Sequence, residues 1–117
     1  MQDVTMYHNP RCSKSRETLA LLQQHGVEPN IVLYLDTPPS LEQLRTLLQQ
    51  LGFSSARELM RKKEDRYKEL ELADENLSEQ QLLQAMVDNP KLIERPIVVK
   101  NGQARIGRPP EQVLEIL

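Results

Sequence analysis

The stretch that decides the fold lies near the start of the chain and reads Val4-Thr5-Met6-Tyr7-His8-Asn9-Pro10-Arg11-Cys12-Ser13-Lys14-Ser15-Arg16. A short apolar strand over residues 4–7 gives way to a helix that begins near Ser13, and the loop between them carries the one cysteine of the chain, Cys12. The free N–H groups and the positive dipole end of a first helical turn favour a thiolate over a thiol. We therefore predict that Cys12 is a nucleophile rather than a buried structural thiol.

The charges around Cys12 support the same prediction. Arg11, Lys14 and Arg16 add three cations, and residues 8–16 contain no acid. Cations and free N–H groups at a helix start also bind small oxyanions. The sequence therefore predicts a site where an oxyanion is held against the sulfur of Cys12.

Composition limits the classes of protein to which the chain can belong. Its 117 residues are enough for one domain with its own core, and a single cysteine excludes an internal disulfide and a cysteine-based zinc site. Residues 1–3 do not resemble the start of a signal peptide, and the longest apolar run, 31–35, is too short to cross a membrane. A net charge of −2 argues against nucleic acid or a membrane as the main partner. We expect a cytoplasmic protein.

The first third of the chain predicts a strand, a helix and a second strand. The helix after Cys12 has Leu19 and Leu22 on its buried side and ends at His25, before Gly26. The second strand, residues 31–35, is a nearly continuous apolar run of the kind found in a sheet that is covered on both faces. Short links imply a right-handed parallel crossover, with the Cys12 loop at the edge of the sheet after the first strand.

Residues 36–94 predict an all-helical insertion. One helix begins at Ser40, with Gln43 in capping-box register, and ends at Gly52. A second helix is expected from residues 54–55, followed by a charged run over residues 61–69 that is typical of a solvated helical face. A last helix begins at Ser78, again with a glutamine three residues later, and ends at residues 89–90.

The end of the chain returns to strands. Residues 97–100 and 103–106 flank Asn101-Gly102, a strong signal for a β-hairpin. Residues 109–110, both proline, begin a terminal helix that is expected to bury Val113, Leu114 and Leu117. The whole order is β-α-β, helical insertion, β-β-α, which predicts an α/β fold with a mixed sheet.

Several motifs together give a specific resemblance. They are Asn9-Pro10-Arg11-Cys12 with Ser15-Arg16, Ser55-Ala56-Arg57-Glu58-Leu59-Met60-Arg61, Tyr67-Lys68-Glu69-Leu70, Arg95-Pro96, and Gly107-Arg108-Pro109-Pro110. Over nearly its whole length the chain resembles the arsenate reductase family that uses glutathione and glutaredoxin, close to its uncharacterised bacterial branch. The resemblance implies a thioredoxin-like fold, formed by one domain over residues 1–117 with its helical insertion at about 36–94.

The resemblance also implies roles for individual residues. Cys12 matches the nucleophile, which attacks the arsenic of arsenate and forms a covalent arsenyl-cysteine. Planar, always-charged guanidinium groups suit an oxyanion that gains charge during the attack. The three arginines that match the oxyanion-binding residues are Arg61, Arg95 and Arg108; Pro96 matches a cis-proline that faces the nucleophile, and His8, Asn9, Ser15 and Arg16 match supporting residues.

The single cysteine shapes the expected reaction sequence. Because the chain has no second thiol, the resemblance implies that glutathione attacks the Cys12 intermediate and that a glutaredoxin reduces the mixed disulfide, with release of arsenite. Arsenate or a related oxyanion is then the substrate and glutathione a co-substrate. No metal ion or organic cofactor is implied.

One other class of arsenate reductase is excluded by the sequence, and two other functions stay open. The arsenate reductases built on a phosphatase loop need Cys-x5-Arg, but the sixth residue after Cys12 is Thr18. A redox-switch regulator that binds RNA polymerase usually carries Cys-x-x-Cys, where this chain has Ser15. A monothiol glutaredoxin-like thiol transferase prefers an aromatic residue or Gly-Phe where this chain has Ser13-Lys14. A polymerase pull-down and a glutathione mixed-disulfide assay would separate these two alternatives from an oxyanion reductase.

Overall fold

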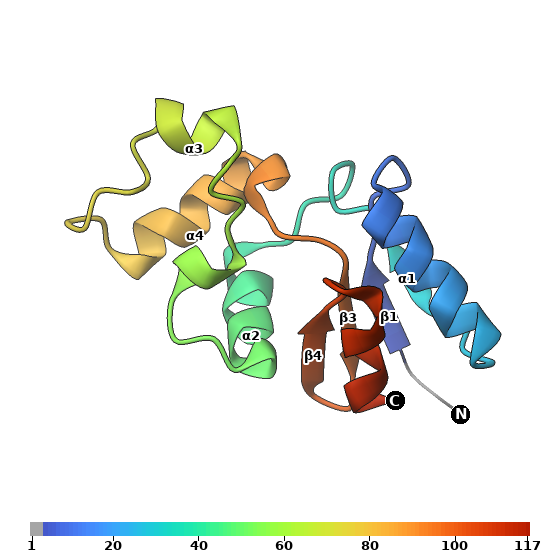
Figure 1. Ribbon diagram of the computed structural model, residues 1–117. Coiled ribbons are helices and arrows are strands. Elements are labelled where there is room, and N and C mark those ends of the chain that lie inside the picture. The colour runs from blue at the N-terminus through green and yellow to red at the C-terminus, as the bar shows by residue number, and fades with distance from the viewer. Residues whose placement is uncertain (1–3) are drawn as a thin grey trace. The chain divides into compact units, whose positions relative to one another are not determined.

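The computed structural model describes residues 4–117; the three residues before Val4, considered above for a targeting signal, lie outside this range. The described chain divides into two units. One contains the residues up to Thr37 together with Arg95–Leu117, and the other is Pro38–Glu94. Figure 1 follows the chain through both units, which are treated separately below. No helix within residues 4–117 is long and apolar enough to span a membrane.

The first unit is built on a four-stranded mixed sheet. Its strands are β1 (Val4–Tyr7), β2 (Asn30–Val32), β3 (Ile97–Lys100) and β4 (Gln103–Ile106), in the order β2-β1-β3-β4. Strand β1 pairs in parallel with β2 and antiparallel with β3, and β3 pairs antiparallel with β4. The hairpin turn has Asn101 and Gly102 at φ 52° and 77°, the positive values that a tight hairpin turn requires. The predicted β-α-β and β-β-α order and the mixed sheet are confirmed.

Two helices cover one face of this sheet. They are α1 (Ser13–Gln24) and the terminal 3₁₀ helix η3 (Pro110–Ile116), which lie side by side in Figure 1. Apolar side chains from both helices meet those of β1 and β3 in one core, and burying each contributes about 1.5–3 kcal/mol. The fully or nearly buried members of this core are Val4, Met6, Leu22, Val27, Val98, Val113 and Ile116. This core fixes α1, and with it the loop that precedes it, against the end of β1.

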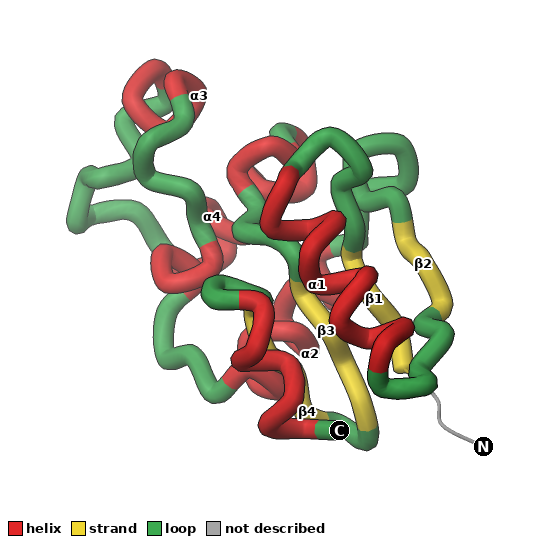
Figure 2. Tube along the Cα trace, turned by 45° about the vertical axis from the view of Figure 1, so that its right-hand side comes forward, coloured by secondary structure: helices red, strands yellow, loops and turns green. Residues whose placement is uncertain are grey.

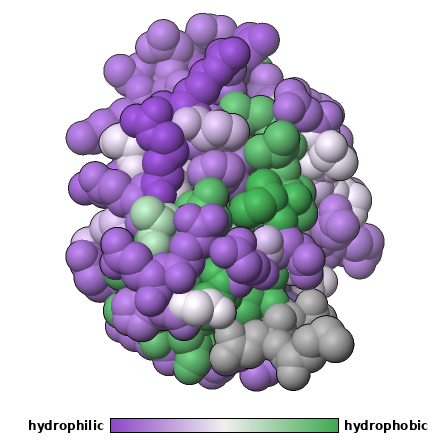
Figure 3. Space-filling view, turned by 90° about the vertical axis from the view of Figure 1, so that its right-hand side faces the viewer, coloured by the Kyte–Doolittle hydropathy of each residue, from purple (hydrophilic) through white to green (hydrophobic). Residues whose placement is uncertain are grey.

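The prediction for the second strand needs correction. Strand β2 ends at Val32 instead of residue 35, because the N–H groups of residues 36 and 37 donate to the carbonyl of Leu33 and form a turn. It lies at the edge of the sheet (Figure 2), and Asn30 and Ile31 are exposed, so the expectation that this strand is covered on both faces is wrong. Three apolar residues in and just after this strand are partly exposed: Ile31 by 42%, Leu33 by 39% and Leu35 by 37%. Figure 3 shows hydrophobic residues, in green, at the surface of one face of the molecule.

The terminal helix buries a different set of residues from the predicted one. Residues 110, 113 and 116 are buried, whereas Leu114 and Leu117 are only partly so. A spacing of three residues is the period of a 3₁₀ helix, which has three residues per turn. The prediction assumed α-helical spacing, and the 3₁₀ geometry is the reason that Ile116 replaces Leu114 in the core.

The second unit, residues 38–94, consists of helices. They are α2 (Leu41–Leu51), η1 (Ala56–Leu59), α3 (Asp65–Glu69), α4 (Glu79–Asp88) and η2 (Pro90–Leu92). Ser40 with Gln43 and Ser78 with Gln81 form the predicted capping boxes, and Gly52 ends α2 at φ 76°. A further capping box, Ser55 with Glu58, starts η1.

The helices expected around residues 54–69 are shorter than predicted. Met60 pairs with Ile93 in an isolated β-bridge, and the N–H of Arg61 donates to the carbonyl of Leu92 over 2.7 Å. Backbone groups committed to this pairing cannot continue a helix. The charged run over residues 61–69 is therefore helical only from Asp65 to Glu69.

Candidate functional site

Cys12 occupies the N-cap position of α1. Its backbone is extended, with φ −94° and ψ 125°, and its carbonyl accepts the N–H of Arg16 over 3.0 Å. The N–H of Cys12 in turn donates to the carbonyl of Asn9 over 3.0 Å, which closes the loop. The Cys12 thiol is partly exposed at the helix start and makes no capping hydrogen bond, and a thiol in this position has the surroundings that favour reactivity.

A buried hydrogen-bond network fixes the loop below Cys12. Ser15 is fully buried, and its Oγ accepts the N–H of Asn9 over 3.0 Å and lies 2.7 Å from Nδ1 of His8. Asn9 Oδ1 accepts the N–H of Arg11 over 3.0 Å. Because every buried polar group named here has a partner, the loop holds one conformation around the cysteine.

His8 enters this network as a neutral ring. The residue is 7% exposed, and burial lowers the pKa of His8 below its usual value. A neutral imidazole has one bare nitrogen, so the Ser15 hydroxyl donates to Nδ1 when the ring proton is on Nε2. The resemblance gives His8 only as a supporting residue, and the structure places its ring in direct contact with Ser15, the buried residue that supports the loop.

Arg108 lies against the sulfur of Cys12. Its Nη2 is 3.7 Å from Sγ, and its Nε donates to the carbonyl of Arg95 over 2.8 Å. The Nε of Arg95 is buried and has no hydrogen-bond partner within residues 4–117. A buried guanidinium N–H without an acceptor is costly unless an acceptor arrives with a ligand, and an anion supplies one.

The chain segments that carry these arginines are held together at Gly107. The Arg95–Pro96 and Arg108–Pro109 peptide bonds are both cis, and the N–H of Gly107 donates to the carbonyl of Pro96 over 3.0 Å. A Cβ placed on Gly107 would lie 2.4 Å from Oγ1 of Thr18 and 2.9 Å from Cγ of Pro96. Thr18 is fully buried on α1, with its hydroxyl donating to the carbonyl of Lys14 over 2.8 Å. Gly107 thus lets the Arg108 segment approach both α1 and Pro96.

We predict that Gly107→Ala destabilises the protein by about 1–3 kcal/mol, because the added methyl group overlaps with Thr18 and Pro96. Urea unfolding measures this loss. The same substitution in a Thr18→Ala background should cost less, since two of the three close contacts are gone. An equal loss in both backgrounds would show that Thr18 and Gly107 do not interact as described.

The remaining predicted residues lie in different surroundings. Arg16 and Arg11 are exposed, and Lys14 forms an ion pair with Glu17 at 3.5 Å, just beyond the acid-free stretch. Arg61 belongs to the second unit, where it pairs with Glu64 at 2.6 Å and Glu94 at 3.7 Å. The structure therefore brings Cys12, Arg95, Arg108 and Pro96 into one unit, and a role for Arg61 at Cys12 stays a prediction.

This arrangement has a definite chemical capacity. It combines a thiol at a helix N-cap with a guanidinium at hydrogen-bond distance and a second guanidinium N–H that lacks an acceptor. Such a site can hold an oxyanion beside the sulfur and stabilise charge that develops on its oxygens. Thr18 and Gly107 complete the site but were not among the predicted residues, although the Gly-Arg-Pro-Pro motif contains one of them.

Comparison with known proteins gives a consistent result. The model of the ArsC family matches residues 7–116. The chain is 72% identical to the uncharacterized protein YfgD of Escherichia coli, with 99% of this chain and 98% of YfgD covered. It is 50% identical to an arsenate reductase of Neisseria meningitidis over the full length of both chains. The solved structure of an arsenate reductase from Vibrio cholerae, 62% identical, superposes with a TM-score of 0.98 over 99% of this chain and 98% of that chain.

Proposed function

The chain belongs to the ArsC family, with its thioredoxin-like fold, and on that premise we propose that it is an arsenate reductase in which Cys12 is the nucleophile. The observation that carries the proposal is the pairing of Arg108 with the Cys12 sulfur, 3.7 Å apart, at the start of α1. A structural thiol gains nothing from a guanidinium, whereas a nucleophilic thiolate and its oxyanion substrate are both stabilised by one. A cytoplasmic location, where thiols stay reduced, suits this chemistry.

The first chemical step joins sulfur to arsenic. The Cys12 thiolate attacks the arsenic of arsenate, the S–As bond forms, and one arsenate oxygen leaves as water after it takes up protons. Arsenic stays As(V) in this step. Arg108 and the buried Nε of Arg95 donate to the arsenate oxygens as their charge increases. We assign Arg61 to the same oxyanion on the family resemblance alone.

The second step needs a thiol from outside the chain, because Cys12 is the one cysteine in the sequence. The thiolate of glutathione attacks the Cys12 sulfur, an S–S bond forms as the S–As bond breaks, and the bonding electron pair stays with arsenic. Arsenic is thereby reduced from As(V) to As(III) and leaves as arsenite, while the two sulfurs are oxidised to a mixed disulfide. A glutaredoxin thiol then reduces this disulfide and restores Cys12.

A single-turnover experiment tests this sequence. Protein is mixed with arsenate and glutathione without glutaredoxin, arsenite is measured, and the mass of the Cys12 peptide is determined. We expect about one equivalent of arsenite per protein and glutathione attached to Cys12, with further turnover only after glutaredoxin is added. Arsenite formation with an unmodified Cys12 would contradict the proposal.

A further inference from the structure

Thr18 lies on the buried side of α1, less than two helical turns after Cys12. Together with Ser15 and Leu22 it forms the fully buried stripe of this helix. A threonine costs more to bury than a valine of nearly the same shape, because its hydroxyl group is removed from water. We propose that Thr18 is a positioning residue, whose Oγ1 sets the distance between the Cys12 sulfur and the Arg108 guanidinium. The inference rests on the proposed function, which makes this pair the place of attack on arsenate.

One side of the Thr18 hydroxyl is tied to the start of α1. It donates to the carbonyl of Lys14 over 2.8 Å, and Cys12 is the N-cap of the same helix. This bond compensates for the burial of the oxygen and holds the branched side chain in one rotamer. Oγ1 is therefore a fixed point of the helix that carries Cys12.

The other side of Oγ1 faces the residue before Arg108. A Cβ placed on Gly107 would lie 2.4 Å from Oγ1 and 3.2 Å from Cγ2 of Thr18. Glycine has a hydrogen atom in that direction, so a Cα–H bond of Gly107 points at Oγ1 with no room for a further atom between them. On its other side Gly107 donates its N–H to the carbonyl of Pro96 over 3.0 Å. A group larger than Oγ1 would therefore displace Gly107 from α1.

A displacement of Gly107 is passed on to the guanidinium of the next residue, Arg108. The N–H of Arg108 donates to the carbonyl of Ile106 over 2.9 Å, and its Nε donates to the carbonyl of Arg95 over 2.8 Å. Because backbone and side chain are held to the same segments, a shift of these segments moves Nη2 relative to Sγ of Cys12, which lies 3.7 Å away. The attraction between a cation and a developing negative charge weakens as this distance grows.

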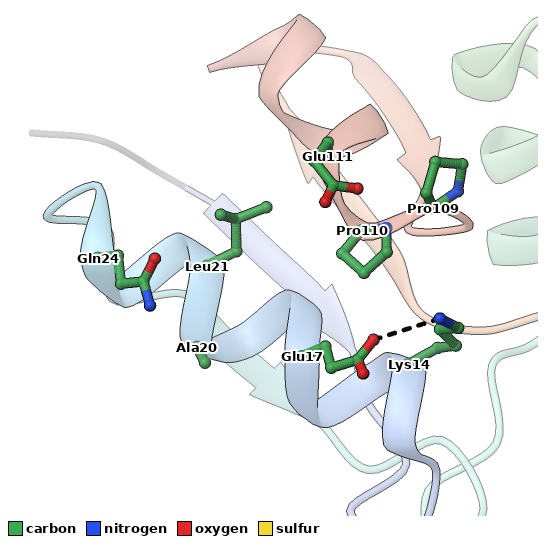
Figure 4. A pocket seen from close by; sticks show the side chains of 8 residues that line it. All are labelled: Lys14, Glu17, Ala20, Leu21, Gln24, Pro109, Pro110 and Glu111. Atoms are coloured by element: carbon green, nitrogen blue, oxygen red, sulfur yellow. Dashed lines mark ion pairs between the residues drawn. The ribbon is translucent and has the colours of Figure 1, made fainter.

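On the outer side of α1, a groove separates the helix from the residues that follow Arg108. It lies between Glu17 on the helix and Pro109 and Pro110 on the other side (Figure 4). An open groove does not fix the distance between its walls, because no side chains interlock across it. Thr18 sets this spacing from the buried side instead.

The experiment changes one arm of the Thr18 side chain at a time. Thr18→Val replaces Oγ1 by a larger methyl group, whereas Thr18→Ser keeps Oγ1 and loses Cγ2. We expect kcat/KM for arsenate to fall about tenfold or more in Thr18→Val and by less than about threefold in Thr18→Ser. The matched control is Thr46→Val on α2 in the second unit, where the exposed Thr46 hydroxyl donates to the carbonyl of Glu42 over 3.1 Å. This control should keep the activity of the intact protein.

A second readout does not depend on arsenate. Iodoacetate and iodoacetamide alkylate the same sulfur, but only iodoacetate carries a negative charge that Arg108 attracts. The ratio of their rate constants therefore reports the guanidinium at Sγ, whereas a general loss of stability changes both rates together. We expect this ratio to fall about threefold or more in Thr18→Val, to stay near the intact value in Thr18→Ser, and to fall no further when Thr18→Val is added to Arg108→Ala. Thr18→Ala, which lacks Oγ1 and cannot overlap with Gly107, should show the same fall and replaces Thr18→Val if that variant does not fold.

The outcomes separate this inference from the proposed function. A ratio that falls in Thr18→Val but not in Thr18→Ser or Thr46→Val supports the positioning role, even in a protein that reduces no arsenate. Arsenate turnover with the same kcat/KM in Thr18→Val and the intact protein overturns the inference and leaves the proposed function intact. Equal falls of the ratio in Thr18→Val and Thr18→Ser overturn it as well, because the position of Oγ1 would then not matter.

Discussion

Replacing Cys12 by serine is expected to abolish arsenate-dependent NADPH oxidation in an assay coupled through glutathione, glutaredoxin and glutathione reductase. The loss should be at least about 1000-fold, since the substitution removes the sulfur that forms the bond to arsenic. Folding should not suffer. Cys12 is partly exposed and occupies the N-cap of α1, where serine is among the preferred residues and accepts an N–H of the first turn.

Urea unfolding provides the control for this substitution. The stability of Cys12→Ser should equal or slightly exceed that of the intact protein, because the serine oxygen caps a helix end that the thiol leaves without a side-chain hydrogen bond. A folded Cys12→Ser variant that keeps a tenth or more of the activity would mean that another group attacks arsenate. The assignment of the nucleophile would then be wrong.

Removing the guanidinium next to the sulfur is expected to have the second-largest effect. Arg108→Ala should lower kcat/KM for arsenate about 100-fold or more, because it removes a donor to the oxyanion and the cation beside Sγ. Arg108→Lys keeps the charge but loses the Nε that donates to the Arg95 carbonyl, so we expect it to recover only part of the loss. Alkylation of Cys12 should be slower in Arg108→Ala, because the guanidinium that lies 3.7 Å from Sγ no longer stabilises negative charge on the sulfur.

A matched arginine elsewhere shows whether the effect is local. Arg66 is exposed and pairs with Glu69 at 3.0 Å in the second unit, so Arg66→Ala removes the same charge from a residue that is not among the predicted site residues. We expect its activity and its alkylation rate to stay close to those of the intact protein. Equal losses in Arg66→Ala and Arg108→Ala would indicate a general effect of charge, and an active Arg108→Ala would remove Arg108 from the site.

Local signals explain why much of the fold is predictable from the sequence. The strand at Val4–Tyr7, the capping boxes at Ser40 and Ser78, and the Asn-Gly hairpin each rest on neighbours within a few residues. The β2 prediction failed because an apolar run does not tell an edge strand from a central one. The terminal helix was placed correctly, but its 3₁₀ period was not visible in its composition.

The candidate site, too, could be predicted from the sequence only in part. The sequence identifies Cys12 by its cationic helix start, and the family resemblance adds Arg95, Arg108 and Pro96, which the structure brings into one unit with Cys12. The sequence does not indicate that Thr18 packs against Gly107. These residues lie far apart in the chain, and they come close only because Gly107 has no side chain. The hydrogen bond between the buried His8 and Ser15 likewise depends on tertiary packing, so the sequence alone does not predict it.

Arsenate reduction at the Cys12 site is tested most directly by the rate that the intact protein shows. NADPH oxidation is followed with glutathione, glutathione reductase and a glutaredoxin, with and without arsenate. We predict an arsenate-dependent rate that requires glutathione and glutaredoxin and is accompanied by arsenite. Absence of any arsenate-dependent rate, in a folded protein whose Cys12 is still alkylated, would contradict this prediction and leave a reactive cysteine that acts on a different substrate.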